Sequence, residues 1–494
     1  MVLADQVGIS RGMGRPTIFI SAYRNFTIRY LLYSKVFESL TKRNIKLVVF
    51  VKDEDVEHYR QKLDSPNVTV EPILYDSAMK AIRGSTLARF FVLVRKCISG
   101  SAGSQRNTTD RIRLYMYRQE LCTSRRGMVV YTILGIVVWL SNKLRWFRKF
   151  LVDVECRLYD GKLYDEYLDR YRPNILVVSS LGYMIDPLFM RAAKRKGVKV
   201  VSIVHSWDNP TTKDYRGCEP DIVIAWNDIM KREVNIFHDI PEERIEIGGI
   251  AHWDFYFDGS FKPKNKELFL REYGLSPNKK ILYYGTSSYK LFRNTFDVIE
   301  ILLGKIKEGA LTQPCQLIVR LHPTYYMLKA EGGDLACEHQ RRQRALEEKY
   351  KGWVAFDEPK IAALNGDVDL SVTDMYRQAE IMYHADILLT EYSTLMIEAA
   401  IMDTPVINVG LFNFRDTDKP ARVIEEYAHI RRILKVGATK NAYDELQLIS
   451  YINAYLDDPS LLKRERQLLV EQEVTANRGS AGIEVARIMA EAHC

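Results

Sequence analysis

A cation and a titratable ring nitrogen follow an apolar run in the second half of the chain. The run Cys315-Gln-Leu-Ile-Val is typical of a buried strand, and Arg320 and His322 come directly after it. In an open α/β sheet, ligands bind outside the carboxyl ends of the strands. We therefore expect Arg320 and His322 to bind the phosphates of a ligand. The alternative is that they form a structural ion pair.

A second apolar run, residues 387–389, brings hydroxyls and carboxylates to the start of a predicted helix. The polar side chains that follow this run are Thr390, Glu391, Ser393 and Thr394. Free N–H groups and the helix dipole add to the hydroxyls there, and this combination suits a phosphate. Glu398 lies one helical turn beyond Thr394, where a carboxylate can accept hydrogen bonds from ribose hydroxyls. The two strand ends together predict a site for a nucleotide diphosphate.

Glu398 also has a simpler interpretation, as an ordinary polar residue on a helix. It is surrounded by Leu395-Met-Ile on one side and Ala-Ala-Ile-Met on the other. An unpaired carboxylate in such an apolar stretch is costly. A hydroxyl-rich ligand is therefore the partner we expect for it.

A third candidate site follows an apolar run in the first half of the chain. Residues 200–204 predict a strand, and it ends in His205-Ser206-Trp207-Asp208. A neutral His205 could take a proton from an acceptor hydroxyl, and Asp208 could orient it or act as the base itself. Trp207 offers a flat apolar face on which a sugar ring could stack. The alternative for His205 is a histidine that closes the loop by hydrogen bonding.

Two shorter polar motifs have less specific interpretations. Arg24-Asn25 follows the first predicted strand and could contact a phosphate or an acceptor, or it could be a solvated turn. Asp367-Val-Asp369 resembles a metal-binding pair of carboxylates, but it precedes residues 371–374, which predict a helix start. We interpret it as a solvated turn and expect no metal site, because Arg, His and helix dipoles can neutralise a diphosphate.

The elements that must position these side chains alternate between strand and helix. In the first half we predict strands at 17–21, 46–51, 174–179, 198–204 and 221–225 and helices at about 27–42, 187–196 and 228–238. In the second half, a strand at 280–284 and a helix at about 294–307 precede the two strands already described. Strand–helix–strand units form parallel sheets. The sequence therefore predicts an α/β protein of two doubly wound domains that face a cleft.

Composition bounds the class of protein. The chain has 494 residues, enough for at least two domains, and 47% of them are hydrophobic. Its seven cysteines are scattered without a CxxC pair, so neither a disulfide framework nor a zinc site is expected. Residues 1–16 lack the apolar core of a signal peptide and are interpreted as a disordered tail. We expect a cytoplasmic protein.

The net charge of +8 is concentrated in one segment. Residues 80–150 contain fifteen Lys and Arg against two acidic residues, a balance of +13, and they enclose the apolar run 128–140. That run is shorter than the roughly 20 residues that span a bilayer. Its cationic flanks, with Trp139 and Trp146 near its end, favour a helix lying on an anionic membrane surface. The alternative is a core helix with a solvated basic collar, and no motif favours nucleic acid.

The chain resembles GT-B glycosyltransferases, in the branch of CDP-glycerol glycerophosphotransferases and bacterial capsule or surface-polysaccharide transferases. The resemblance rests on Arg320-x-His322-Pro323 and on residues 385–406. It implies two Rossmann-like domains, with the acceptor bound by residues 17–251, the nucleotide donor bound by residues 281–494, and a linker at 252–280. The donor-binding positions that it implies are Gly285, Thr286, Ser287, Arg320, His322, Glu391, Ser393, Thr394 and Glu398.

The resemblance departs from the glycerophosphotransferases at the acceptor histidine, which they follow with Gly and, slightly later, Lys. Here His205 is followed by Ser206 and Trp207. We therefore expect a sugar donor, moved from a nucleotide diphosphate to a surface-glycan or lipid-linked acceptor at the inner face of the membrane. The alternatives are a CDP-glycerol glycerophosphotransferase, a UDP-sugar 2-epimerase of the same fold, and a binding protein without turnover.

Overall fold

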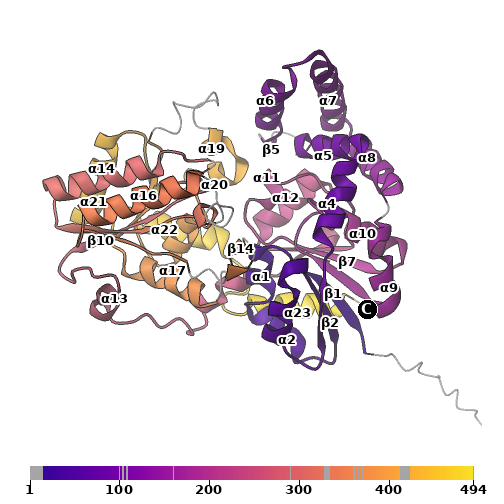
Figure 1. Ribbon diagram of the computed structural model, residues 1–494, viewed down its shortest axis with the longest axis horizontal. Coiled ribbons are helices and arrows are strands. Elements are labelled where there is room, and N and C mark those ends of the chain that lie inside the picture. Colours follow the sequence, from indigo (N-terminus) through magenta and orange to yellow (C-terminus); the bar gives the residue numbers. More distant parts are fainter. Residues whose placement is uncertain are drawn as a thin grey trace, which may run out of the picture.

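Two parallel β-sheets lie side by side, each covered by helices on both faces (Figure 1). The computed structural model describes residues 15–492 except 99–100, 103–104, 107–108, 160, 290, 327–333, 360–362, 365–366, 369–371 and 412–422. One hydrophobic cluster continues from the first sheet to the second and includes both Ile18 and Met396. The two halves are therefore joined by packed side chains.

The first sheet has seven parallel strands in the order β3-β2-β1-β6-β7-β8-β9. Their bounds are β1 Thr17–Ser21, β2 Lys46–Val51, β3 Val68–Pro72, β6 Ile175–Val178, β7 Lys199–Ile203, β8 Ile222–Ala225 and β9 Ile245–Ile247. The strand order reverses between β1 and β6, and the loops that follow these two strands diverge there. Ligands bind at such a switch point in open α/β sheets. The predicted doubly wound sheet is confirmed.

Helices flank this sheet. Their bounds are α1 Asn25–Leu31, α2 Lys35–Thr41, α3 Val56–Lys62, α9 Asp165–Tyr171, α10 Asp186–Arg195, α11 Asn209–Thr212 and α12 Asp228–His238. Of these, α1, α2, α10 and α12 lie close to where the sequence predicts helices, whereas it does not predict α3, α9 and α11. The single helix predicted at 27–42 is two helices. Ser34 interrupts it with an extended backbone, and its hydroxyl oxygen accepts a hydrogen bond from the N–H of Val36 at 3.2 Å, which caps α2.

The second sheet has six parallel strands in the order β12-β11-β10-β15-β16-β17, with a switch point between β10 and β15. Their bounds are β10 Lys280–Gly285, β11 Cys315–Arg320, β12 Val354–Phe356, β15 Ile387–Thr390, β16 Val406–Val409 and β17 Thr439–Ala442. The helices around it are α14 Thr295–Glu308, α16 Asp334–Lys349, α17 Val372–His384, α18 Leu395–Ile401, α19 Val423–Glu426, α20 Ala428–Val436, α21 Glu445–Asp457 and α22 Lys463–Glu473. β13 (Ala363–Leu364) and β14 (Asp367–Val368) form a separate antiparallel pair.

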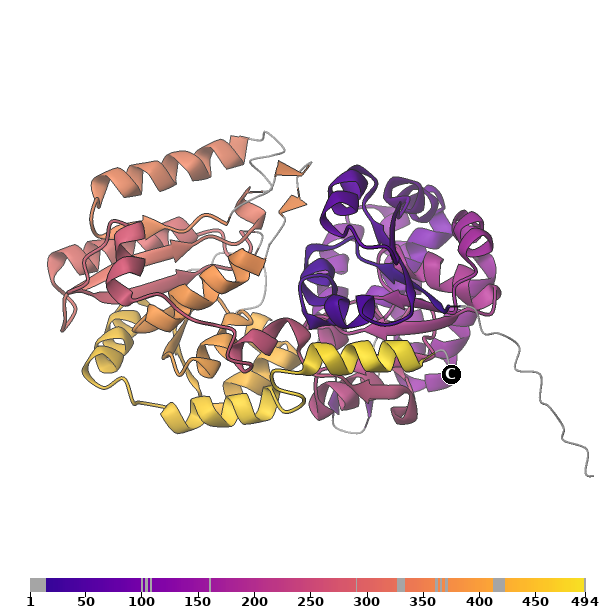
Figure 2. The same ribbon diagram turned by 90° about the horizontal axis from the view of Figure 1, so that it is seen from below.

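The chain crosses between the two domains twice. The 3₁₀ helix η4 (Ala251–Tyr256) and α13 (Lys266–Glu272) lie in the predicted linker, and α23 (Ala481–Glu491) returns to pack against α2 (Figure 2). The Asp254 carboxylate accepts hydrogen bonds from the N–H groups of Ala481 and Gly482, each at 2.8 Å. A Cβ at position 482 would lie 2.8 Å from the Cβ of Lys35, so glycine allows the close approach of the two helices.

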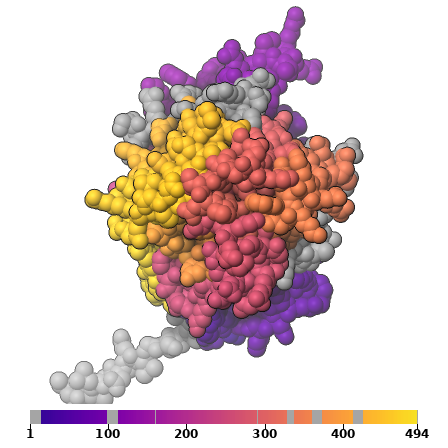
Figure 3. All heavy atoms as spheres, turned by 90° about the vertical axis from the view of Figure 1, so that its left-hand side faces the viewer, coloured from indigo at the N-terminus to yellow at the C-terminus, as the bar shows by residue number. Residues whose placement is uncertain are grey.

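The basic segment forms helices that stand out from the first domain. They are α4 Tyr75–Gly84, α5 Thr86–Cys97, α6 Thr109–Leu121, α7 Arg125–Lys143 and α8 Arg145–Leu158, with a short β4–β5 pair (Ser101–Ala102 and Gln105–Arg106) between α5 and α6. Figure 3 shows these purple helices projecting beyond the second domain. Leu134 and Val138 of α7 are buried in a small core of the segment's own. Among the described residues, no helix is long and apolar enough to cross a membrane.

Candidate functional site

His205 lies directly past β7, at the carboxyl edge of the first sheet. Its Nδ1 is paired with the carbonyl oxygen of Ser179, which can only accept a hydrogen bond, so Nδ1 carries the proton. Burial, with the Arg24 guanidinium acting in the same direction, lowers the pKa of His205 to about 3. The imidazole is therefore neutral, and its Nε2 has a free lone pair that can accept a proton.

Asp208 does not contact the imidazole of His205, contrary to the predicted orienting role. Its carboxylate accepts hydrogen bonds from the hydroxyls of Ser206 at 2.6 Å and Thr212 at 2.7 Å, and it pairs with Lys213 at 3.3 Å. Burial acts to raise the pKa of Asp208, but Lys213 and His429 outweigh it and hold that pKa below its ordinary value. The carbonyl of Ser179 performs the orienting role instead, which a sequence motif of side chains could not indicate.

Trp207 is only 5% exposed, so its ring offers no open face to a sugar in this structure. It packs edge-on against the ring of His429, with centroids 4.7 Å apart. His429 belongs to α20 of the second domain, and its Nδ1 is bonded to the hydroxyl of Thr211 at 2.8 Å. The predicted stacking residue is therefore part of the contact between the two domains.

Arg24 is held by the loop that follows β6 in the first domain. Its guanidinium donates to the carbonyl and the hydroxyl oxygen of Ser179, each at 3.0 Å, and to the hydroxyl of Tyr183, and it lies 3.6 Å from Asp186. Asn25 is half-buried at the start of α1. Arg24 thus joins the loops on both sides of the β1–β6 switch point, immediately beside His205.

Glu391 holds the loop that follows β10, residues 285–287, by hydrogen bonds. The Glu391 carboxylate accepts hydrogen bonds from the Ser287 N–H at 2.7 Å and the Tyr284 hydroxyl at 2.6 Å. Burial raises the pKa of Glu391 to about 7, against the lowering effect of these bonds. At Gly285 a Cβ would lie 2.4 Å from a methyl carbon of Leu395, so a larger residue would require the Leu395 side chain to move. Glu391 therefore supports the loop from within the protein.

Arg320 matches the alternative interpretation, a structural ion pair. Its guanidinium pairs with the carboxylate of Asp357 and with both oxygens of Asp374, at 2.6 and 2.7 Å. Burial acts to lower the pKa of Arg320, but the two carboxylates outweigh it and raise that pKa further above its ordinary value. Asp374 lies in α17, and Asp357 directly follows β12. The fold therefore brings together three residues that lie far apart in the sequence.

His322 is neutral and presents a donor. Its Nδ1 accepts a hydrogen bond from the N–H of Thr324 at 3.2 Å, which places the ring proton on Nε2. Its own backbone N–H donates to the hydroxyl oxygen of Thr286 at 2.9 Å. Burial lowers the pKa of His322 to about 4. His322 thus offers a ligand a neutral N–H donor rather than a positive charge.

The hydroxyls at the start of α18 are close together. The Ser393 hydroxyl lies 2.9 Å from the Thr390 hydroxyl, and its oxygen accepts a hydrogen bond from the N–H of Leu395 at 3.3 Å. Thr394 precedes the helix and makes no side-chain capping bond. Their contact with a phosphate stays a prediction.

Glu398 faces the first domain from the buried side of α18. One of its oxygens accepts a hydrogen bond from the hydroxyl of Tyr256 at 2.7 Å, and the side chain is 4% exposed. Burial raises the pKa of Glu398, and the nearby Arg29 opposes that rise. A carboxylate oxygen thus lies where the linker residue Tyr256 meets the second domain. Its predicted contact with a ribose stays a prediction.

Arg29 is the functional candidate that sequence reasoning missed. It is 9% exposed, its Nε has no hydrogen-bond partner, and it forms no ion pair with any described carboxylate. It lies close enough to Glu398 and His252 to affect the pKa of both. A buried guanidinium that forms no ion pair and leaves its Nε without a hydrogen bond is costly, which points to an anionic ligand.

The arrangement of α1 explains how Arg29 reaches this place. Residues three and four apart share one face of a helix. Phe26 stacks on His205 with ring centroids 6.2 Å apart, and Tyr30 packs on His252 at 5.4 Å, so Arg29 shares the face between them. The only signal in the sequence is a basic residue among the apolar residues of a predicted helix. In most proteins such a basic residue is exposed to solvent.

Among the described residues, no cluster of three or more His, Cys, Asp or Glu side chains could hold a metal ion. Of the Asp367-Val-Asp369 motif, Asp369 lies outside the described residues, and Asp367 belongs to β14. The helix predicted after it is α17. A reaction without a metal stays a prediction.

No family model matches the chain, and no curated protein matches its sequence. Several solved structures are similar in fold. A Listeria monocytogenes protein assigned as a UDP-N-acetylglucosamine 2-epimerase has a TM-score of 0.52 at 11% identity, over 96% of this chain and 95% of its own. MnaA of S. aureus, solved with UDP, has a TM-score of 0.50 at 11% identity, over 96% of this chain and 94% of its own.

A glycosyltransferase from Rickettsia africae has a TM-score of 0.49 at 13% identity, over 97% of this chain and 98% of its own. Structural similarity at identities this low shows a shared fold and does not show a shared reaction. With the two parallel sheets already described, the likeness defines the class: the chain has the GT-B fold of two Rossmann-like domains. The predicted fold class is confirmed.

Proposed function

We propose that the protein is a glycosyltransferase, which moves a sugar from a nucleotide diphosphate donor to the hydroxyl of a second substrate. One observation carries this proposal. Arg29, a buried cation without a partner, lies at the domain junction next to Glu398 on one side and the His252–His205 pair on the other. These groups match the phosphate, the ribose and the acceptor hydroxyl of such a reaction.

Arg29 and His322 would hold the diphosphate, and Glu398 would accept from the ribose. Glu398 Oε2 is already bonded to Tyr256, so Oε1 is the oxygen left for a ligand. The Nε2–H of His322 donates from the end of β11, beside β10 and the Gly285 loop. This assignment transfers to Arg29 the charge-neutralising role that the sequence gave to Arg320.

His205 would take the proton from the acceptor. As the acceptor oxygen bonds to the anomeric carbon, the bond from that carbon to the diphosphate breaks, and the hydroxyl proton moves to His205 Nε2. The low pKa of about 3 keeps Nε2 unprotonated before the donor binds. A bound diphosphate adds negative charge nearby, which raises the pKa of the imidazole toward the range of an effective base.

The acceptor would be presented at a membrane by α7 and α8. Val129, Ile136 and Trp139 of α7 are 60, 55 and 61% exposed. At about 100° per residue they share one side of the helix with Arg125 and Lys143 at its two ends. An apolar stripe between cations fits an anionic bilayer surface. A glycan or lipid-linked acceptor would meet the cleft from this side.

Vesicle flotation tests the membrane contact. Changing Val129, Ile136 and Trp139 together to Ser should reduce binding to phosphatidylglycerol vesicles at least tenfold, because each buried apolar side chain is worth about 1.5–3 kcal/mol. The matched control is Leu446→Ser, at a side chain that is 84% exposed on α21. Equal flotation of both variants and the wild type would contradict the contact.

A UDP-sugar 2-epimerase is the second candidate, because the similar structures include a protein assigned as a UDP-N-acetylglucosamine 2-epimerase and one solved with UDP. An epimerase interconverts a UDP-sugar without any acceptor. Incubation with UDP-N-acetylglucosamine alone, followed by NMR, separates the two. Epimer formation would favour this candidate over the transferase, and CDP-glycerol consumption in a parallel tube would favour the glycerophosphotransferase.

A further inference from the structure

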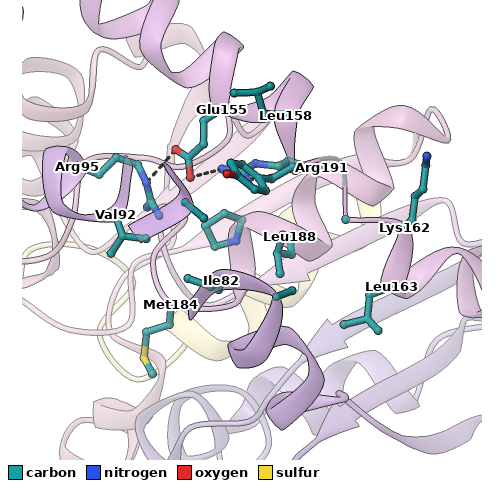
Figure 4. A pocket seen from close by; sticks show the side chains of 15 residues that line it. Ile82, Val92, Arg95, Glu155, Leu158, Lys162, Leu163, Met184, Leu188 and Arg191 are labelled. Carbon is teal, nitrogen blue, oxygen red and sulfur yellow. Dashed lines mark hydrogen bonds and ion pairs between the residues drawn. The ribbon is translucent and has the colours of Figure 1, made fainter. Parts of the chain in front are cut away.

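A pocket lies where the helices of the basic segment meet the helices that cover the first sheet, away from the domain junction. It has a volume of about 230 Å³ and is walled by α4, α5, α8 and α10 (Figure 4). Its lining is mostly apolar and includes Ile82, Val92, Leu158, Leu163, Met184 and Leu188. Nothing in the proposed transfer reaction uses it.

The floor of this pocket is a buried set of charges. Glu155 lies between two arginines, 3.1 Å from Arg95 Nε and 2.9 Å from Arg191 Nη2, and all three are at most 5% exposed. Arg95 also donates to the carbonyl of Gly182, and Arg191 to that of Gly217. The charges of this floor are thus paired with one another and with main-chain carbonyls beneath apolar walls.

The pocket is continuous with the surface that faces the membrane in the proposed function. Leu158, at the end of α8, lines the rim and is 53% exposed, and the same helix exposes Trp146 and Phe150 to 63 and 50%. Apolar side chains therefore lead along α8 from its amino-terminal end to the mouth of the pocket.

Another wall connects the pocket to the proposed base, His205. Met184 lines the pocket from the loop after β6, and Pro187 lines it from the start of α10. Earlier in the same loop, Ser179 is bonded to His205 and Tyr183 is bonded to Arg24. A ligand in the pocket would therefore contact the loop whose Ser179 carbonyl orients the imidazole of His205.

We propose that this pocket binds the end of one hydrocarbon chain of an anionic membrane lipid; the proposal rests on the membrane contact of the proposed function. The size supports a chain end, because 230 Å³ is below the roughly 300–1,000 Å³ of pockets that enclose whole ligands. The apolar walls match methylene groups, and the cations of the basic segment, such as Arg125 and Lys143 at the two ends of α7, favour a lipid of negative charge over a neutral one.

Photo-crosslinking tests the proposal without any nucleotide. The probe is phosphatidylglycerol with a diazirine at the end of one acyl chain, in vesicles, with the full chain and mapping of labelled peptides by mass spectrometry. We expect labels on α4, α5 and α10. Val92→Trp and, independently, Leu188→Trp fill the pocket and should lower that labelling at least tenfold, while Ile133→Trp on the exposed face of α7 should not.

Three outcomes are informative. Labelling confined to α7 and α8, or unchanged labelling of α10 in both filled variants that keep wild-type circular dichroism, overturns the pocket. Equal labelling of α10 from phosphatidylcholine overturns the preference for a lipid of negative charge. Because the readout is a lipid adduct, loss of transferase activity with retained α10 labelling would remove the proposed function and keep the lipid site.

Discussion

Two buried arginines lie on opposite sides of the domain junction, and they differ in how their charge is satisfied. Arg320, in the motif that the sequence makes conspicuous, is enclosed by Asp357 and Asp374. Arg29, in an inconspicuous helix of the first domain, forms no ion pair with a described residue, and the longer-range charge of Glu398 acts on it. The first arginine is paired within the second domain, and the second is left without an ion pair.

The difference shows what a motif at a strand end conveys. A strand that ends in Arg320 fixes where the guanidinium lies, but its carboxylate partners come from β12 and α17, far away in the sequence. Pairing therefore decides between structure and binding, and pairing is a property of the fold. The predictions below separate the two arginines.

Arg320→Ala should cause the largest loss of stability. It removes a cation from Asp374 and one of the two cations that pair with Asp357, the other being Arg377. Breaking a buried pair in this way costs about 3–5 kcal/mol. Denaturation in urea, followed by circular dichroism, measures it. A loss below about 1 kcal/mol would mean that Arg320 is not a structural residue, and Arg60→Ala, at an arginine 52% exposed, is the control.

His205→Gln should lower the transfer rate while leaving donor binding intact. General-base catalysis contributes about 10²–10⁴-fold, and the imidazole contacts the acceptor rather than the nucleotide. Turnover by product chromatography and donor affinity by calorimetry are measured on the same variant. A matched fall in affinity would place His205 with Arg29 in the donor site and contradict its role as base.

Arg29→Met should stabilise the protein without ligand, in contrast to Arg320→Ala. Replacing an unpaired buried charge by an apolar chain of similar length removes a desolvation cost, and a gain of about 1–2 kcal/mol is expected. The same urea denaturation measures it. A loss as large as that of Arg320→Ala would show that Arg29 has a structural partner.

The free energies of unfolding contributed by Glu391 and by His205 should depend on pH with opposite sign. The folded pKa of Glu391, about 7, lies above its unfolded value, so the stability it contributes is present at low pH and is lost as pH rises toward 7. The folded pKa of His205, about 3, lies below its unfolded value, so its contribution is lost as pH falls below about 6.5.

Unfolding free energies at pH 5 and 7 test this contrast. Relative to Glu391→Gln, the wild type should gain on the order of 1 kcal/mol per pH unit toward pH 5; relative to His205→Gln, it should lose a similar amount. Slopes of the same sign in the two pairs would show that one of the two groups is not buried in the state described.

The sequence predicted the scaffold well because local rules determine it. β1, β2 and α12 have the predicted bounds, and buried apolar runs leave little choice of element. The helix break at Ser34 was missed because an apolar helical period continues across it. At the site, Glu398 and the Gly285 loop lie at the expected edge, since strand order alone places them there.

The rest of the site depends on contacts between distant segments. The orienting partner of His205 is a main-chain carbonyl, and Trp207 is covered by α20 from the other domain. Arg29 became a candidate only when the fold showed that it forms no ion pair, even with the nearby carboxylate of Glu398. No pattern of residue types along the chain carries that information.

Calorimetric titration of nucleotides tests the central claim most directly. UDP, CDP, GDP, CMP and their sugar conjugates are titrated into the wild type, Arg29→Gln and the exposed control Arg60→Gln. At least one diphosphate should bind the wild type and Arg60→Gln alike and bind Arg29→Gln about 10–100-fold more weakly, since a hydrogen bond to a charged group is worth about 1.5–3 kcal/mol. No nucleotide binding to the wild type, or equal affinity for Arg29→Gln, would contradict it.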